Sequence, residues 1–305
     1  MKIRSKRTLN GDILVNLFCV FLILVCLLPM LNLLAQSFSS SQSVINSKVK
    51  FLPVVHNMEE NTYKTGMTLE SYKYVFLDPA FTRSMWWTAI LTAICTLVSL
   101  GMTILCAFPL TYDWLRGKAV INTLIIFTMY FGAGTIPNYI LMKSLNLLNN
   151  PLVLIIPNCL SVFNMIILRS FFYGIPVSLR ESAEMDGANP LTVLMKIYLP
   201  LSGAVLATLA LFYAVGRWNG FGDALLYISG VASKWYPIQL KLWTLIQNQT
   251  SIDISTVELV GGTVPRASDA IKAAAIMFAT VPILVVYPWL QRHFIVGVTI
   301  GGVKE

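Results

Sequence analysis

The stretch ILVNLFCVFLILVCLLPMLNLLA, residues 13–35, decides the class of fold. It holds no charged residue and no alternation of polar and apolar side chains. At about 1.5 Å of rise per residue, a helix over this stretch reaches about 34 Å, enough to cross the hydrocarbon core of a bilayer. A secretory signal has an apolar core of only about 7–15 residues. The sequence therefore predicts an uncleaved first transmembrane helix, with cleavage near Gln36 as the minor alternative.

The composition extends this prediction to the whole chain. Of the 305 residues, 56% are hydrophobic and only 12% are charged, whereas a soluble domain has roughly 25% charged residues. Only helices and closed barrels span a bilayer, because every backbone polar group must be satisfied there. The apolar runs are long and do not alternate, which favours helices over barrel strands. We expect an all-α integral membrane protein.

Six apolar runs predict six transmembrane helices. We place these helices at residues 13–35, 86–110, 119–142, 151–173, 201–226 and 270–291, with the third interrupted by Gly132, Gly134 and Pro137. Leu69, Tyr72 and Phe76 recur at helical spacing, so a short interfacial helix is expected before the second span. The polar, serine-rich segment 36–85 that contains this short helix is placed outside the cell.

Basic residues orient the predicted helices. Four of them precede the first span, and Arg116 and Lys118 lie in the short loop after the second span. Because short cytoplasmic loops carry an excess of Lys and Arg, this pattern places the amino terminus in the cytoplasm. With six crossings, the carboxyl terminus is then cytoplasmic as well.

Charge, cysteine and histidine content argue against nucleic-acid and metal binding. The net charge of +8 comes from basic residues scattered over loops, which is typical of an anionic membrane face rather than of a nucleic-acid-binding patch. All five cysteines lie inside apolar runs and are interpreted as buried apolar side chains. The two histidines, His56 and His293, are far apart, so no metal site is expected.

The polar loop 174–200, between the fourth and fifth spans, carries strong local signals. Ser178 followed by Glu181 predicts a capping box at the start of a helix. Gly187 suits the left-handed residue that ends such a helix. Asn189, which a proline follows, predicts the start of a second helix. Two short helices joined by a tight turn outside the membrane indicate a docking surface for a partner.

This loop resembles the EAA loop of bacterial ATP-binding-cassette importer permeases. The family's pattern is Glu-Ala-Ala, three residues, Gly, nine residues, Ile-x-Leu-Pro, and six of its seven fixed positions match. The departure is Ser182, which stands where the pattern has its first alanine. The matching residues, with the Asp and Ala that flank the glycine, are Glu181, Ala183, Asp186, Gly187, Ala188, Ile197, Leu199 and Pro200.

Further short stretches are similar to the carbohydrate-uptake branch of this family. They lie at residues 68–72, 115–118, 168–172 and 297–301. The nearest likeness is to lipoprotein-linked permeases for complex oligosaccharides. The resemblance implies a type I importer fold, with a core permease domain at residues 68–305 that follows an accessory region at residues 1–67.

The resemblance also implies a role for the loop and a set of partners. Loop 174–200 would be the coupling helix, which sits in a groove of an ATPase subunit. Glu181 would pair with a basic residue of the ATPase, Ala183 and Ala188 would allow close approach, and Gly187 would make the turn. The implied partners are a second permease subunit, two ATPases, an extracellular solute-binding protein and an oligosaccharide, at the bacterial cytoplasmic membrane. The alternative is that these residues only cap an ordinary loop.

The chain carries no signature of an enzyme. No Gly-x-x-x-x-Gly-Lys-Ser/Thr loop is present, and no catalytic constellation can be assembled with only two histidines. We therefore expect no cofactor on this chain, with ATP and Mg²⁺ bound by a separate ATPase.

Polar residues inside the apolar spans mark the candidate substrate path, because burying them in lipid is costly. If residues 217–223 are helical, Asn219 and Asp223 share one face of the fifth span. The full candidate set is Arg217, Trp218, Asn219, Asp223, Asn158, Asn164, Gly134 and Asn138. The alternative is interfacial anchoring by Arg217 and Trp218, glycine-mediated helix packing, interhelical hydrogen bonding and kinks.

The expected function is that of the permease subunit of an ATP-driven, binding-protein-dependent importer for an oligosaccharide. Three alternatives stay open. They are an importer permease for a non-sugar solute, an ion-driven secondary transporter, against which loop 174–200 argues, and a structural or sensory membrane protein that docks an ATPase.

Overall fold

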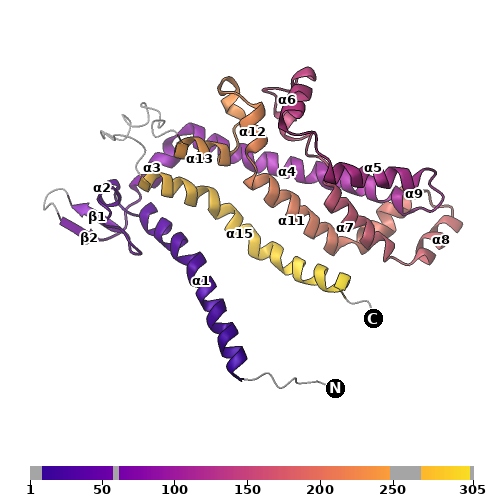
Figure 1. Cartoon of the computed structure of the whole chain (residues 1–305), viewed down its shortest axis with the longest axis horizontal. Helices are drawn as coiled ribbons and strands as arrows, with labels where there is room; N and C mark the ends of the chain where they lie inside the picture. The colour runs from indigo at the N-terminus through magenta and orange to yellow at the C-terminus, as the bar shows by residue number, and fades with distance from the viewer. Residues whose placement is uncertain (1–8, 58–61, 248–268, 303–305) are drawn as a thin grey trace. The chain divides into compact units, whose positions relative to one another are not determined.

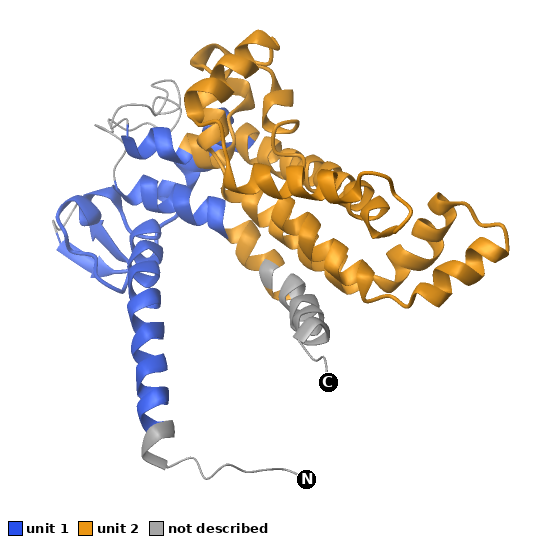
Figure 2. Ribbon diagram, turned by 45° about the vertical axis from the view of Figure 1, so that its right-hand side comes forward, with its two compact units in different colours: residues 1–82, 242–280 blue, residues 83–241, 281–305 orange. Residues whose placement is uncertain are grey.

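The computed structural model describes residues 9–57, 62–247 and 269–302, most of them in helices (Figure 1). The chain divides into two compact units (Figure 2). Unit 1 comprises Met1–Thr82 and Leu242–Thr280, and unit 2 comprises Arg83–Lys241 and Val281–Glu305.

Unit 1 contains a small hairpin that the prediction of helices alone missed. Its elements before α4 are α1 (Leu9–Ser37), α2 (Ser41–Ile45), β1 (Val54–Asn57), β2 (Thr62–Thr65) and α3 (Glu70–Leu77). The two strands pair antiparallel, with Val54 opposite Thr65. The outer edge of β1 is satisfied by serine hydroxyls, because Ser39 Oγ accepts from the Val54 amide at 3.0 Å and Ser40 Oγ accepts from the His56 amide at 3.1 Å. The short helix predicted before the second span is present as α3, and its interfacial position stays a prediction.

The later elements begin with the long helix α4 and end with α15. In chain order they are α4 (Pro79–Ala107), η1 (Pro109–Thr111), α5 (Lys118–Tyr130), α6 (Thr135–Ser144), η2 (Pro151–Leu154), α7 (Val162–Tyr173), α8 (Val177–Met185), α9 (Pro190–Val193), η3 (Leu194–Tyr198), α10 (Leu199–Leu201), α11 (Gly203–Asn219), α12 (Gly222–Tyr227), η4 (Gly230–Trp235), α13 (Ile238–Gln247) and α15 (Asp269–Gly302).

Three helices of the described part are long and apolar enough to cross a membrane by themselves. These candidate spans are Ile13–Ser37, Pro79–Thr111 and Asp269–Val286. The second begins earlier than the predicted Trp86, because the Asp78 carboxylate accepts a hydrogen bond from the Ala80 amide and starts the helix at Pro79. The third continues as helix α15 beyond the predicted end at residue 291.

The other three predicted spans are not continuous helices. The expected interruption of the third span is confirmed, whereas the breaks in the fourth and fifth spans were not predicted. Residues 119–142 divide into α5 and α6, which are bent by 114° around Gly134 at φ +87°. Residues 151–173 form the short η2, a non-helical stretch and α7. Residues 201–226 form α11 and α12, separated at Gly220. Glycine and proline cause these breaks, since both are poor helix formers.

Bent helix pairs raise the number of possible spans to six in the described part of the chain. The other two bent pairs are Val162–Tyr173 with Val177–Met185, at 74°, and Pro190–Leu201 with Gly203–Asn219, at 85°. Both pairs include helices of the loop 174–200, so they do not coincide with the predicted spans.

An aromatic core joins three segments of unit 2. Phe108 and Tyr112 follow α4, Phe172 lies on α7, and Tyr198 ends η3. These four rings, here called the aromatic core, are buried and meet edge-to-face, with the centroids of Phe108 and Tyr198 5.1 Å apart and those of Phe172 and Tyr198 5.3 Å apart. Helices α5, α7 and α11 pack beside one another (Figure 1).

Candidate functional site

Helices α8 and α9 form an elbow at residues 177–193. The predicted capping box is wrong, because α8 begins at Val177 after Pro176 and Ser178 already lies inside the helix. The end of α8 is as predicted, since Gly187 adopts φ +82°. Its amide donates to the Glu184 carbonyl at 3.0 Å, and the Ala188 amide donates to the Ala183 carbonyl at 2.9 Å. This pair of bonds is a Schellman motif, which fixes the direction of the chain after α8.

Asn189 caps α9, as the sequence predicted. Its side-chain oxygen accepts a hydrogen bond from the Thr192 amide at 2.7 Å, and Pro190 is the first helical residue. The same oxygen accepts from the Thr192 hydroxyl at 2.8 Å. The elbow is therefore held on both sides of Gly187 by local hydrogen bonds.

Replacing Asn189 by alanine is expected to destabilise this elbow by about 1 kcal/mol, because the first amides of α9 lose their acceptor. Asn189→Asp keeps an acceptor and is the matched control. Thermal unfolding of the purified chain in detergent measures both variants. Equal midpoints for Asn189→Ala and the unmodified chain would contradict the role of the cap.

The motif residues divide between an outer and an inner face of the elbow. Within α8 and its turn, Glu181, Ser182, Asp186 and Gly187 are exposed. The partly buried Ala183 and Ala188 pack against the core of unit 2, as do Ile197 and Leu199, whereas Pro200 is exposed. Sequence reasoning missed Met185, an apolar side chain that is 88% exposed beside the acidic residues. Met185 could have been noticed in the sequence as an apolar residue at the end of a polar helix.

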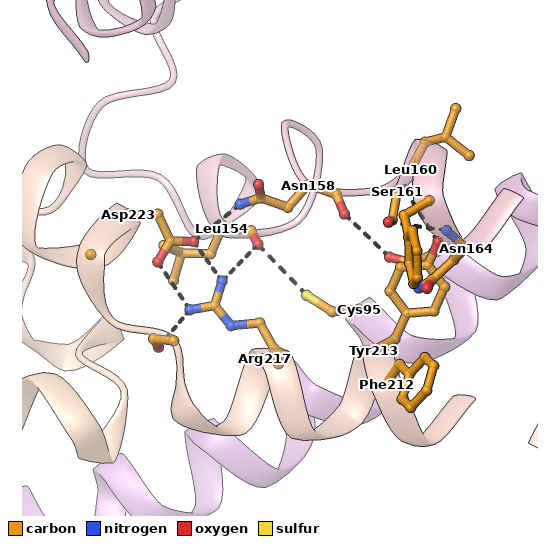
Figure 3. Close-up of a pocket in the computed structure, with 15 residues that line it drawn as sticks. Cys95, Leu154, Asn158, Leu160, Ser161, Asn164, Phe212, Tyr213, Arg217 and Asp223 are labelled. Carbon is orange, nitrogen blue, oxygen red and sulfur yellow. Dashed lines mark hydrogen bonds and ion pairs between the residues drawn. The ribbon is translucent and has the colours of Figure 1, made fainter. Parts of the chain in front are cut away.

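A pocket of about 740 Å³ lies within unit 2 (Figure 3), and it is here called the polar pocket after the Asn, Ser, Arg and Asp side chains that share its wall with apolar residues. Helices α4, α7, α11 and α12 contribute to its wall, together with η2 and the chain that follows it. Of the predicted substrate-path residues, the structure brings together Asn158, Asn164, Arg217 and Asp223. The volume falls in the range of small-molecule sites, which is roughly 300–1,000 Å³.

The remaining candidates lie outside this pocket's lining. Trp218 is buried on another side of α11, where it lines a separate apolar pocket with residues of α4 and α15. Asn219 is the exposed last residue of α11. Gly134 and Asn138 are exposed at the start of α6. The expected shared helical face of Asn219 and Asp223 does not form, because the helix breaks at Gly220.

Arg217 and Asp223 form a buried ion pair where α11 breaks. Their side chains are 8% and 15% exposed. The two terminal nitrogens of the Arg217 guanidinium, Nη1 and Nη2, donate to the carboxylate, with Nη2 3.0 Å from Asp223 Oδ1. Arg217 also donates to the carbonyls of Gly220, at 3.0 Å, and Leu154, at 3.3 Å (Figure 3). One side chain thus holds α11, α12 and η2 together, and the break in the helix provides it with a free carbonyl.

Three residues of the pocket were not predicted from the sequence. Tyr213 lies one turn before Arg217 on the same face of α11, and its hydroxyl is 2.6 Å from Thr103 Oγ1 and accepts from the Ser161 amide at 3.1 Å. Phe163 and Phe212 are exposed aromatic rings in the pocket wall. Tyr213 could have been predicted from its i, i+4 spacing to Arg217. The two phenylalanines lie in apolar runs, so nothing in the sequence distinguished them from other apolar residues.

Comparison with known proteins identifies the family to which this chain belongs. The family of binding-protein-dependent transport system inner membrane components matches residues 13–299. This chain belongs to that family. It is therefore a multi-pass component of the inner membrane and a transport permease rather than an ATPase. The resemblance noted in loop 174–200 is thereby confirmed at the level of the family.

Individual relatives cover nearly the whole chain. It is 37% identical over 293 residues to the polygalacturonan/rhamnogalacturonan transport system permease protein YtcP of Bacillus subtilis, covering 96% of this chain and 98% of that one. It is 41% identical over 282 residues to protein LplC of the same organism, covering 92% and 90%. A solved bacterial ABC transporter involved in the import of the acidic polysaccharide alginate has a chain with a TM-score of 0.85 and 28% identity, covering 96% of this chain and 100% of that chain.

Proposed function

We propose that this chain is the permease subunit of an ATP-driven, binding-protein-dependent importer that carries an oligosaccharide across the cytoplasmic membrane. The observation that carries the proposal is that unit 2 holds both parts such a subunit needs, an exposed elbow and a sugar-sized polar pocket. The polysaccharide transport described for YtcP and for the alginate transporter supports an oligosaccharide cargo.

The elbow is proposed to dock an ATPase. Its outer face presents Glu181 and Asp186 to solvent, and two exposed carboxylates suit a basic groove on a partner. Ala183 and Ala188 let the elbow lie close to the core behind it. ATP and Mg²⁺ would be bound by that partner, not by this chain. A ligand shifts a conformational equilibrium only by binding one state more tightly than the other. ATP, bound by the partner, would therefore act on this chain through the docking face.

The polar pocket is proposed to be the substrate path. Amides of Asn158 and Asn164 and the hydroxyls of Ser161 and Tyr213 offer neutral donors and acceptors, which match sugar hydroxyls. The charges of Arg217 and Asp223 cancel within their ion pair. Gly134, Asn138, Trp218 and Asn219 stay predictions for other points of the path.

The arrangement in the membrane and the assembly are also part of this proposal. We propose six spans with both termini in the cytoplasm, an accessory region at residues 1–67 and a core permease domain at residues 68–305 with the coupling loop 174–200. A second permease subunit, two ATPases and an extracellular solute-binding protein would complete the importer. A bacterial alginate ABC transporter has also been solved in complex with a periplasmic protein that holds an alginate pentasaccharide, which supports such a partner.

Uptake by proteoliposomes that contain the complete complex tests this function. We expect accumulation of a labelled oligosaccharide that requires both ATP and the binding protein. Uptake of a non-sugar solute alone would favour the other class of importer. Uptake driven by an ion gradient without ATP would favour a secondary transporter, and ATPase binding without any uptake would favour a structural or sensory role.

A further inference from the structure

Arg180 is a charged residue of α8 that points inward. Its neighbours Leu179 and Glu181 are exposed, whereas only 12% of the Arg180 side chain is exposed. No residue of α8 is fully buried. Arg180 is therefore the largest side chain by which α8 contacts the rest of unit 2, beside the small, partly buried Ala183.

The guanidinium of Arg180 lies over an aromatic ring. Its central carbon is 4.6 Å from the centroid of Tyr112, within the range of a cation–π contact. Arg180 Nε is 3.9 Å from Glu184 Oε1, one helical turn further along α8. Burial, with the nearby charge of Glu184, raises the pKa of Tyr112 to about 12, so its ring stays a neutral phenol at working pH.

Tyr112 connects this contact to the membrane helices. It is 3% exposed and lies in the connection between α4 and α5. Its ring meets Phe108 at 5.3 Å and Trp114 at 5.2 Å between centroids. Through Phe108 it belongs to the aromatic core, which reaches α7 and η3. The Tyr112 ring thus places Arg180 against a packed cluster that has little freedom to deform.

We propose that Arg180 is a positioning residue that transmits movement of the elbow to the α4–α5 connection through its contact with the Tyr112 ring. This inference rests on the proposed function, because it assumes that an ATPase moves α8. Glu181 faces the partner, and its neighbour Arg180 faces the bundle. Of these two adjacent residues, Glu181 therefore serves docking and Arg180 serves transmission.

The proposal is tested on the complete complex in proteoliposomes, with transport per ATP hydrolysed as the readout. Arg180→Met keeps the length of the side chain and removes its charge. We expect it to co-purify with the ATPase at the unmodified yield, while transport per ATP falls about tenfold, a size typical of coupling mutations. Arg180→Lys retains a cation and is expected to restore part of the ratio. Arg116→Met, at an exposed arginine of the α4–α5 connection, is the matched control and should leave it unchanged.

A double variant separates transmission from general destabilisation. Tyr112→Leu should lower transport per ATP as Arg180→Met does, and the combination should be no worse than either, because both remove one contact. Three results would each overturn the proposal. They are an unchanged transport per ATP in Arg180→Met, additive losses in the double variant, and loss of ATPase co-purification in Arg180→Met. Failure of the unmodified chain to bind an ATPase would instead overturn the proposed function.

Discussion

Gly187→Asp is expected to abolish transport and substrate-stimulated ATP hydrolysis while the protein remains inserted and folded. Gly187 adopts φ +82°, a conformation that costs most other residues about 1–2 kcal/mol but that aspartate and asparagine tolerate better. A Cβ added there meets no atom within 4 Å, so the effect comes mainly from the new charge and not from a clash. The aspartate would add a carboxylate to a face that already exposes Glu181 and Asp186. Uptake assays and ATPase assays on the reconstituted complex measure the loss.

Asparagine at the same position is the control. Gly187→Asn tolerates the left-handed conformation and adds no charge, so it should retain most of the transport. If Gly187→Asp transports normally, the turn does not couple the elbow to the ATPase. If both variants fail to insert, Gly187 serves folding instead.

Arg217→Leu is expected to destabilise the chain by about 3–5 kcal/mol and to eliminate uptake, because it leaves the Asp223 carboxylate buried without its partner. The two carbonyls that Arg217 binds, of Leu154 and Gly220, would lose their donor as well. Thermal unfolding in detergent measures the stability, and the uptake assay measures the function.

The double variant Arg217→Leu/Asp223→Leu distinguishes the stability of the pocket from its chemistry. Removing both charges should recover much of the lost stability, since no buried charge is left unpaired. Uptake should stay absent if the pair belongs to the substrate path. Unchanged stability in Arg217→Leu would show that the ion pair does not hold α11, α12 and η2 together, and full uptake by the double variant would remove it from the path.

Local features of the elbow could be predicted because they depend on neighbouring residues. Gly187 adopts the left-handed conformation that the absence of a Cβ allows, and the side chain of Asn189 caps α9. The start of α8 was missed because Pro176, not Ser178, precedes the helix, which begins at Val177 and includes Ser178. The hairpin β1–β2 was missed because its strands are four residues each, too short for a periodic pattern to stand out.

The sequence by itself determined that the chain is a helical membrane protein of a known permease family and where its elbow lies. The length of an apolar run and the residues of a turn are local properties of the sequence, and they do not depend on how the helices pack. Only the tertiary structure decided where the fourth and fifth predicted spans break, that Asp223 folds back onto Arg217, and that Arg180 lies on Tyr112. The partners Arg180 and Tyr112 are 68 positions apart in the sequence, and periodicity along one helix contains no information about which distant helix packs against it.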